Sequence, residues 1–87
     1  MIRKKYTLNS INGLSSRSSL QLVNISNKYD SELILEFNEE RANLKSIMSV
    51  MALIIKNKES FIIEADGEDE NDAINALEEL MNGIKLI

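Results

Sequence analysis

The most regular alternation of hydrophobic and polar residues covers residues 32–37. Leu33, Leu35 and Phe37 fall on one side of this stretch, which predicts a strand with one face toward a hydrophobic core. Residues 38–39 then favour a tight turn into a short partner strand. Together with weaker patterns elsewhere, the alternation predicts four strands, over residues 2–8, 32–37, 40–43 and 60–66.

The strand predicted over residues 60–66 is largely hydrophobic. Phe61, Ile63 and Ala65 are expected to face the core, and Glu64 is expected to face away from it. A glycine ends this strand, and the acidic residues that follow place negative charge at the start of the last helix, where the helix dipole favours it. That helix carries a broad hydrophobic stripe formed by Ala73, Ile74, Leu77, Leu80, Met81 and Ile84.

Three helices are predicted between and after the strands. The first covers about residues 16–27 and begins at Ser15 or Ser16, because serine is a favoured N-cap residue. The second follows Ser46 in the same way, and the third ends near Gly83, the predicted C-cap. The order strand, helix, strand, strand, helix, strand, helix predicts an α+β fold with helices on one face of a sheet.

The short helix after Ser46 is hydrophobic on two sides. Ile47, Met48 and Met51 cluster on one side at ~100° per residue. The other side is formed by Val50, Leu53 and Ile54. Because a chain of 87 residues has only a modest core, we expect one side to pack against that core and the first side to remain exposed for a partner.

Length and composition narrow the class of protein. The 87 residues are enough for a single domain, residues 1–87, and no run approaches the ~18 apolar residues of a membrane span. A net charge of −4 argues against nucleic-acid binding. We therefore expect a cytoplasmic protein that has neither a nucleic acid nor a membrane as its partner.

The residue types that are absent limit the chemistry. The chain has no cysteine and no histidine, which excludes thiolate chemistry, histidine general bases and histidine phosphorylation. The acidic residues between Asp66 and Asp72 do not have the spacing of a calcium loop, so we expect a solvated helix start there. No metal, no cofactor and no catalytic residues are predicted, and we do not expect an enzyme.

The segment Asn-Leu-Lys-Ser-Ile-Met-Ser-Val-Met, residues 43–51, resembles the regulatory-serine segment of HPr. HPr is the histidine-containing phosphocarrier of the bacterial sugar phosphotransferase system. The likeness covers nearly the whole chain and includes residues 5–8, 13–14, Arg17 and 67–70. It implies the HPr fold, an open-faced β-sandwich in which a four-stranded antiparallel sheet is covered on one face by three helices.

The resemblance ends where HPr carries its phosphate. The family pattern after Gly-Leu is His-Ala-Arg-Pro, whereas this chain has Ser15, Ser16, Arg17 and Ser18. Ser15 therefore stands at the former phosphoacceptor position, and only Arg17 matches. A serine hydroxyl is a weak nucleophile without an adjacent base, so we interpret the carrier function as lost. On sequence alone Ser15 is expected to be a helix cap, with phosphorylation by a kinase as the alternative.

The resemblance also implies regulation at Ser46. It predicts phosphorylation of this residue by the HPr kinase/phosphorylase and binding to a LacI-type catabolite repressor. A phosphate at a helix start gains from the helix dipole and adds a charge of about −1.5 to −2. The residues expected to contact partners are Arg17, Leu20, Ile47, Met48 and Met51.

The sequence is compatible with three functions. The first is a regulatory protein without carrier activity, similar to the catabolite-repression HPr paralogue, which also lacks the histidine. The second is a divergent phosphocarrier that accepts phosphate at Ser15. The third is a degenerate HPr paralogue that folds but has little activity. The expected oligomeric state is a monomer or a weak homodimer.

Overall fold

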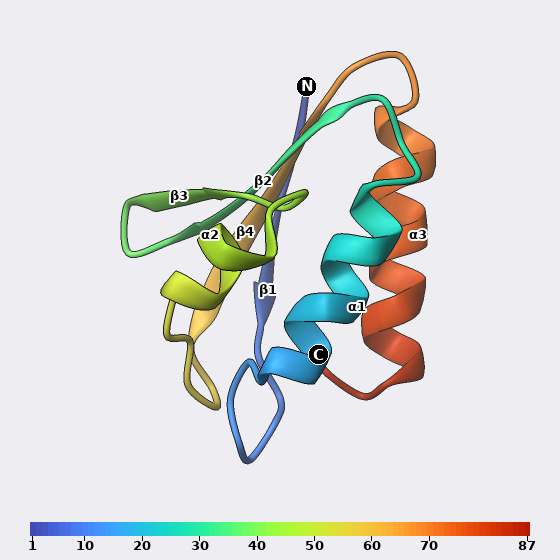
Figure 1. The fold of residues 1–87 in the computed structure, drawn as a ribbon. Helices are drawn as coiled ribbons and strands as arrows, with labels where there is room; N and C mark the ends of the chain where they lie inside the picture. Colours follow the sequence, from blue (N-terminus) through green and yellow to red (C-terminus); the bar gives the residue numbers. More distant parts are fainter.

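Four strands and three helices follow one another in the predicted order (Figure 1). The computed structural model describes all 87 residues. The elements are β1 (Ile2–Thr7), α1 (Ser16–Ser26), β2 (Glu32–Phe37), β3 (Glu40–Asn43), α2 (Ile47–Ala52), β4 (Ser60–Asp66) and α3 (Glu70–Gly83). None of the helices combines the length and the hydrophobicity that crossing a membrane requires.

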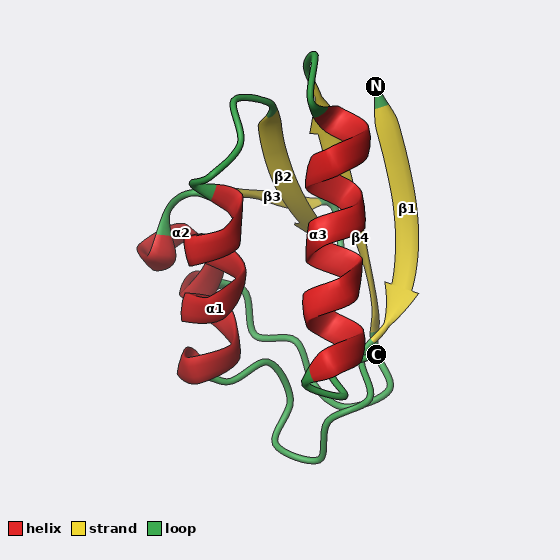
Figure 2. Cartoon of the chain, turned by 90° about the vertical axis from the view of Figure 1, so that its right-hand side faces the viewer, coloured by secondary structure: helices red, strands yellow, loops and turns green.

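The strands form one antiparallel sheet in the order β1-β4-β2-β3. β4, the last strand in the sequence, lies between β1 and β2 and pairs with both. All three helices lie on one side of this sheet (Figure 2). The predicted α+β fold, with a four-stranded antiparallel sheet covered on one face by three helices, is confirmed.

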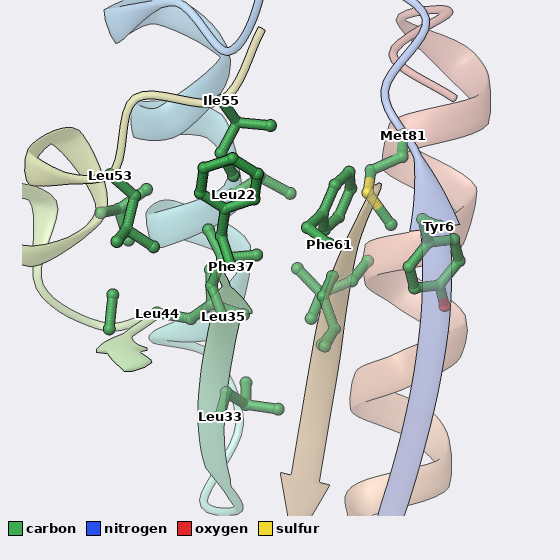
Figure 3. Packing of buried hydrophobic residues seen from close by; sticks show 14 of the residues in the cluster. Tyr6, Leu22, Leu33, Leu35, Phe37, Leu44, Leu53, Ile55, Phe61 and Met81 are labelled. Carbon is green, nitrogen blue, oxygen red and sulfur yellow. The ribbon is translucent and has the colours of Figure 1, made fainter. Parts of the chain in front are cut away.

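The hydrophobic core lies between the sheet and the helices. Leu33, Leu35 and Phe37 are buried on the helix side, as their alternation predicted. Met81 of α3 reaches toward Phe61 of β4 (Figure 3). The ring of Phe61 stacks on Tyr6 of the neighbouring strand, with centroids 5.7 Å apart. Burial of each large side chain contributes roughly 1.5–3 kcal/mol, so the amphipathic strands and helices stabilise one another.

The turn between β2 and β3 follows directly from its two residues. Asn38 and Glu39 both have positive φ, 49° and 68°. This is the backbone of the two-residue hairpin turn whose twist matches the flanking strands. The predicted tight turn is confirmed, and it sets the register in which Phe37 pairs with Glu40.

The exposed face of the sheet carries a ring of ion pairs that the sequence did not predict. Glu64 of β4 points away from the helices, as expected, but its side chain is buried between two arginines. Its carboxylate lies 2.6 Å from Arg3 of β1 and 2.8 Å from Arg41 of β3. The same arginines bind Glu36 of β2, at 3.1 Å and 2.8 Å. Two edge strands are thus tied to the two central strands.

These contacts change the titration of both carboxylates. Hydrogen bonds from Arg41 and Arg3 lower the pKa of Glu64 below its ordinary value of 4.5. Hydrogen bonds from the same two arginines lower the pKa of Glu36 in the same way. Both glutamates therefore stay ionised across the neutral and mildly acidic range, and the four charges compensate one another.

One residue of the acidic stretch before α3 has a structural role. Asp69 is the N-cap residue of α3, yet its side chain makes no capping hydrogen bond to that helix. Its carboxylate instead accepts hydrogen bonds from the backbone N–H groups of Asp30, at 2.8 Å, and Ser31, at 2.9 Å, and from the Ser31 hydroxyl. The bond from the Ser31 hydroxyl is the main cause that lowers the pKa of Asp69 below 3.8. Asp69 thus joins the loop before β2 to the loop before α3.

The prediction for the end of α3 is wrong at Gly83. Gly83 is the last helical residue, Ile84 is the C-cap, and the left-handed residue is Lys85, with φ of 57°. The Leu86 N–H donates to the Met81 carbonyl at 2.8 Å, which closes a Schellman turn. Because Leu86 is buried, the core fixes where the chain reverses, and a lysine accepts the conformation that usually favours glycine.

Candidate functional site

Ser46 begins α2 as the predicted N-cap. Its backbone is extended, and its Oγ accepts a hydrogen bond from the Ser49 N–H at 3.4 Å. The Val50 N–H donates to the Ser46 carbonyl at 3.1 Å, the first bond of the helix. With only six residues, α2 is shorter than two turns, so its dipole gives less support to a phosphate than the sequence suggested.

Hydrogen bonds connect the loop before Ser46 to the turn that directly follows α1. The Lys45 ammonium donates to the Tyr29 carbonyl at 2.6 Å. The Asn27 side-chain amide donates to the carbonyls of Val23, at 2.9 Å, and Lys45, at 3.2 Å. The two bonds that involve Lys45 join positions 16 and 18 residues apart in the sequence, and no local pattern indicated them. They fix the backbone on which Ser46 is presented.

α2 buries one side and exposes the other, as predicted. Val50 is fully buried, whereas Met48 is 83% exposed and Met51 50% exposed. The prediction is wrong for Ile47, which was expected on the exposed side but is half-buried and packs against the edge of the core. The short helix therefore anchors itself through Val50 and presents two methionine side chains to solvent beside Ser46.

The expectation that Ile54 packs on the buried side is wrong. α2 ends at Ala52, and Leu53 is an extended C-cap residue whose side chain is buried. The helical periodicity stops there, so Ile54 turns outward and is 75% exposed. We name the three exposed side chains Met48, Met51 and Ile54 the exposed hydrophobic patch.

A cleft of about 350 Å³ lies beside Ile54. Its other wall is the loop of residues 11–14, which the sequence did not indicate as part of the site. Ile11, which is highly exposed, lines the same cleft. The Leu14 N–H donates to the Ile55 carbonyl at 2.9 Å, which holds the two loops together. Gly13 lies so close that an added Cβ would be 2.6 Å from the Ile55 carbonyl oxygen, and its φ is +71°. The only sequence signal for this approach was the glycine itself.

Ser15 is the N-cap of α1, one of the two serines predicted for this role. Its Oγ accepts a hydrogen bond from the Ser18 N–H at 3.2 Å and lies 3.0 Å from the Ser18 hydroxyl. The neighbours of the hydroxyl are thus another serine and the helix backbone. Neither is a base that could make it a strong nucleophile.

Arg17 and Leu20 both lie on α1 and are both exposed. Arg17 makes no ion pair and no side-chain hydrogen bond within the chain. It lines a cleft with Ser18, Gln21 and Lys85. α1 packs against α2, so Leu20 lies on the helix next to the one that carries Met48 and Met51. Arg17 is free to contact a partner.

Both the sequence and the fold are similar to those of known proteins. Residues 2–83 match the family described as the PTS HPr component phosphorylation site. The chain belongs to the HPr family. HPr is a phosphocarrier protein rather than a catalyst, and the expected cytoplasmic location agrees with membership of this family.

Solved structures of HPr proteins superpose closely on this one. The histidine-containing phosphocarrier protein of Mycoplasma is 35% identical, with a TM-score of 0.95 over 99% of this chain and 98% of its own. An HPr from Thermoanaerobacter tengcongensis is 29% identical, with a TM-score of 0.88 over 94% of this chain and 92% of its own. The whole fold is therefore shared with phosphocarriers of this family.

The chain is also similar to Crh, the catabolite repression protein of Bacillus subtilis. One Crh structure, a dimer with a swapped domain, is 29% identical and covers 95% of each chain with a TM-score of 0.74. This HPr-family chain is thus similar both to phosphocarriers and to a catabolite-repression protein.

Proposed function

We propose that this HPr-family protein is regulatory and does not carry phosphate on a histidine. In this proposal an HPr kinase/phosphorylase phosphorylates Ser46, and the modified protein binds a LacI-type catabolite repressor. The observation that carries the proposal is the exposed hydrophobic patch immediately beside Ser46. Met48, the most exposed member of the patch, is only two residues from the hydroxyl.

The chemistry at position 15 supports the loss of carrier function. HPr carriers in the family pattern use a histidine, whose phosphoramidate readily passes its phosphoryl group onward. This chain contains no histidine at all, and its Ser15 hydroxyl is occupied as a helix cap. A serine phosphate ester is a poorer phosphoryl donor, and no base lies beside Ser15 to help form it.

The distribution of charge supports modification at Ser46. Residues 9–29 and 41–58, which contain both capping serines and the exposed hydrophobic patch, hold six basic and no acidic residues. The remaining segments hold four basic residues and all 14 acidic ones. A phosphate at Ser46 would therefore add negative charge to a basic part of a chain whose net charge is −4.

The surroundings of Ser46 also suit a repressor. A hydrophobic contact through Met48 and Met51 would supply buried area, and a phosphate would add charge-assisted hydrogen bonds to arginine or lysine on the partner. Such bonds are roughly twice as strong as neutral ones. Arg17 and Leu20 on the adjacent helix extend the contact surface.

Incubation with an HPr kinase/phosphorylase and ATP, followed by mass-spectrometric mapping, tests the proposal. We expect one phosphate, on Ser46, and tighter binding of the phosphorylated protein to a LacI-type repressor. Phosphate on residues 15–19 instead would overturn the assignment. Transfer from phosphoenolpyruvate and enzyme I to Ser15 would support the divergent carrier, and no modification in either assay would support a degenerate paralogue.

A further inference from the structure

The four methionines of the chain occupy very different environments. Met48 and Met51, both in the exposed hydrophobic patch, are 83% and 50% exposed. Met81 is fully buried in the core under α3, and Met1, at the start of the chain, is 68% exposed. Two of the three accessible thioethers therefore lie in the surface proposed for docking, beside Ser46.

We propose that Met48 and Met51 form a reversible oxidation site that switches off docking at the exposed hydrophobic patch. This inference rests on the proposed function, because it assigns a regulation to the same surface. The oxidant is hydrogen peroxide or a related peroxide. The product is methionine sulfoxide, which thiol-dependent sulfoxide reductases return to methionine.

The oxidation needs no further co-reactant. The thioether sulfur donates an electron pair to one peroxide oxygen, the O–O bond breaks and an S–O bond forms. The released hydroxide takes the proton from the oxygen now bound to sulfur and leaves as water. Sulfur is oxidised by two electrons, and hydrogen peroxide is reduced to water.

The structure indicates why this change would matter at these two residues. An exposed methionine is flexible and apolar, and it adapts well to a hydrophobic partner surface. A sulfoxide is polar, and a partner would have to bury its oxygen without a matched donor. Burying an unpaired polar group weakens binding by roughly tenfold or more. Because the side chains point to solvent, the same change leaves the core intact.

Treatment of the intact protein with hydrogen peroxide, followed by peptide mapping, tests whether Met48 and Met51 are oxidised selectively. We expect Met48 and Met51 to gain one oxygen each well before Met81, whose burial makes it an internal reference. Retention on a hydrophobic-interaction column should fall, whereas far-UV circular dichroism should not change. Equal oxidation of Met81, or unchanged retention after oxidation of Met48 and Met51, would overturn the inference.

Phosphorylation by an HPr kinase/phosphorylase tests the effect on docking. Oxidation should lower the phosphorylation rate of Ser46 about tenfold, and treatment with sulfoxide reductase should restore it. The matched control is the double variant Met48→Leu, Met51→Leu, which keeps Met1 as an oxidisable exposed residue. Compared with its own untreated sample, this variant should lose no rate after peroxide treatment.

The outcomes separate this inference from the proposed function. If the untreated protein is not phosphorylated on Ser46, the proposed function fails, and peptide mapping with column retention still decides the oxidation site. If the untreated protein is phosphorylated and its sulfoxide form is phosphorylated equally fast, the switch is refuted while the proposed function stands. If peroxide treatment slows phosphorylation of the double variant, the residue whose oxidation matters lies outside the patch.

Discussion

Ser15 and Ser46 occupy equivalent positions at the starts of two helices. Each is an N-cap with extended backbone, and each hydroxyl accepts a hydrogen bond from the N–H three residues later. The surroundings differ. Ser15 is followed by polar residues up to Ser19, whereas Ser46 is followed by Ile47 and by the highly exposed Met48. Capping geometry alone therefore does not distinguish the two serines, and the proposed regulatory role of Ser46 rests on the surface beside it.

The helices that the two serines begin also differ. α1 has 11 residues and buries Leu22 and Val23, so it belongs firmly to the core. α2 has six residues and buries only Val50. A short helix with a single fully buried residue leaves Met48 and Met51 exposed, which is what a docking surface needs.

The largest expected difference between the two serines is in phosphorylation. Ser46→Ala should abolish modification by an HPr kinase/phosphorylase, whereas Ser15→Ala should leave it intact, because the highly exposed Met48 lies two residues after Ser46 and only polar residues follow Ser15 up to Ser19. Both variants lose an N-cap and should be destabilised by about 1 kcal/mol, so stability serves as the matched control. Mass spectrometry and urea unfolding measure the two effects. Equal loss of phosphate in both variants would remove the distinction between the serines.

Two substitutions in α2 distinguish the role of its buried side from that of its exposed side. Val50→Ala should lower the free energy of unfolding by roughly 1–3 kcal/mol, since it removes buried methyl groups. Met48→Asp should change that free energy by only about 0.5 kcal/mol, yet it should slow phosphorylation by tenfold or more. Thermal unfolding and kinase kinetics provide the measurements. If Met48→Asp unfolds the protein, Met48 supports the core and the patch is not a docking surface.

Acid should lower the free energy of unfolding of the fold that positions both serines. Glu36, Glu64, Asp69 and Glu70 have pKa values below their ordinary 4.5 or 3.8 in the folded protein. Their stabilisation is therefore fully present above those ordinary values and is lost as the pH falls through the lowered folded values. Urea unfolding between pH 7 and pH 3 should show a decline that begins near pH 4.5.

The control for this decline is Glu64→Gln. It removes one titrating group from the ring of ion pairs, so it should lower stability at pH 7 and make the acid decline shallower. The phosphorylation site should be unaffected, because the ring lies on the opposite face of the sheet from α2. An unchanged pH profile in this variant would mean that the ring does not couple stability to pH.

The smallest effect is expected on phosphotransfer when a histidine is introduced at position 15. Wild-type protein should form no acid-labile phosphoprotein with enzyme I and phosphoenolpyruvate. Ser15→His should restore little transfer, since Ser16 and Ser18 also differ from the family pattern and the native Ser15 hydroxyl is part of the α1 cap. Phosphotransfer assays with radiolabelled phosphoenolpyruvate measure both. Efficient transfer to an enzyme II from either protein would contradict the regulatory interpretation.

Much of this protein follows from local sequence. The alternation of Leu33, Leu35 and Phe37 placed a strand and its buried face correctly, because strand periodicity depends only on neighbouring residues. The same holds for the turn at residues 38–39 and for Ser46, whose cap bond spans three residues. The position of the candidate site was predictable because a cap and a short hydrophobic run are both local signals.

The contacts between distant segments could be decided only by the tertiary structure. Arg3 meets Glu64, 61 positions away, because β4 pairs with β1, and Asp69 meets Ser31, 38 positions away, because two loops lie together. Ile54 was misplaced because α2 ends at Ala52, where packing of Leu53 outweighs the helical period. Side-chain type and spacing specify which face an element can bury. Which charged groups meet, and where a short helix stops, depends on the energy of packing the whole chain.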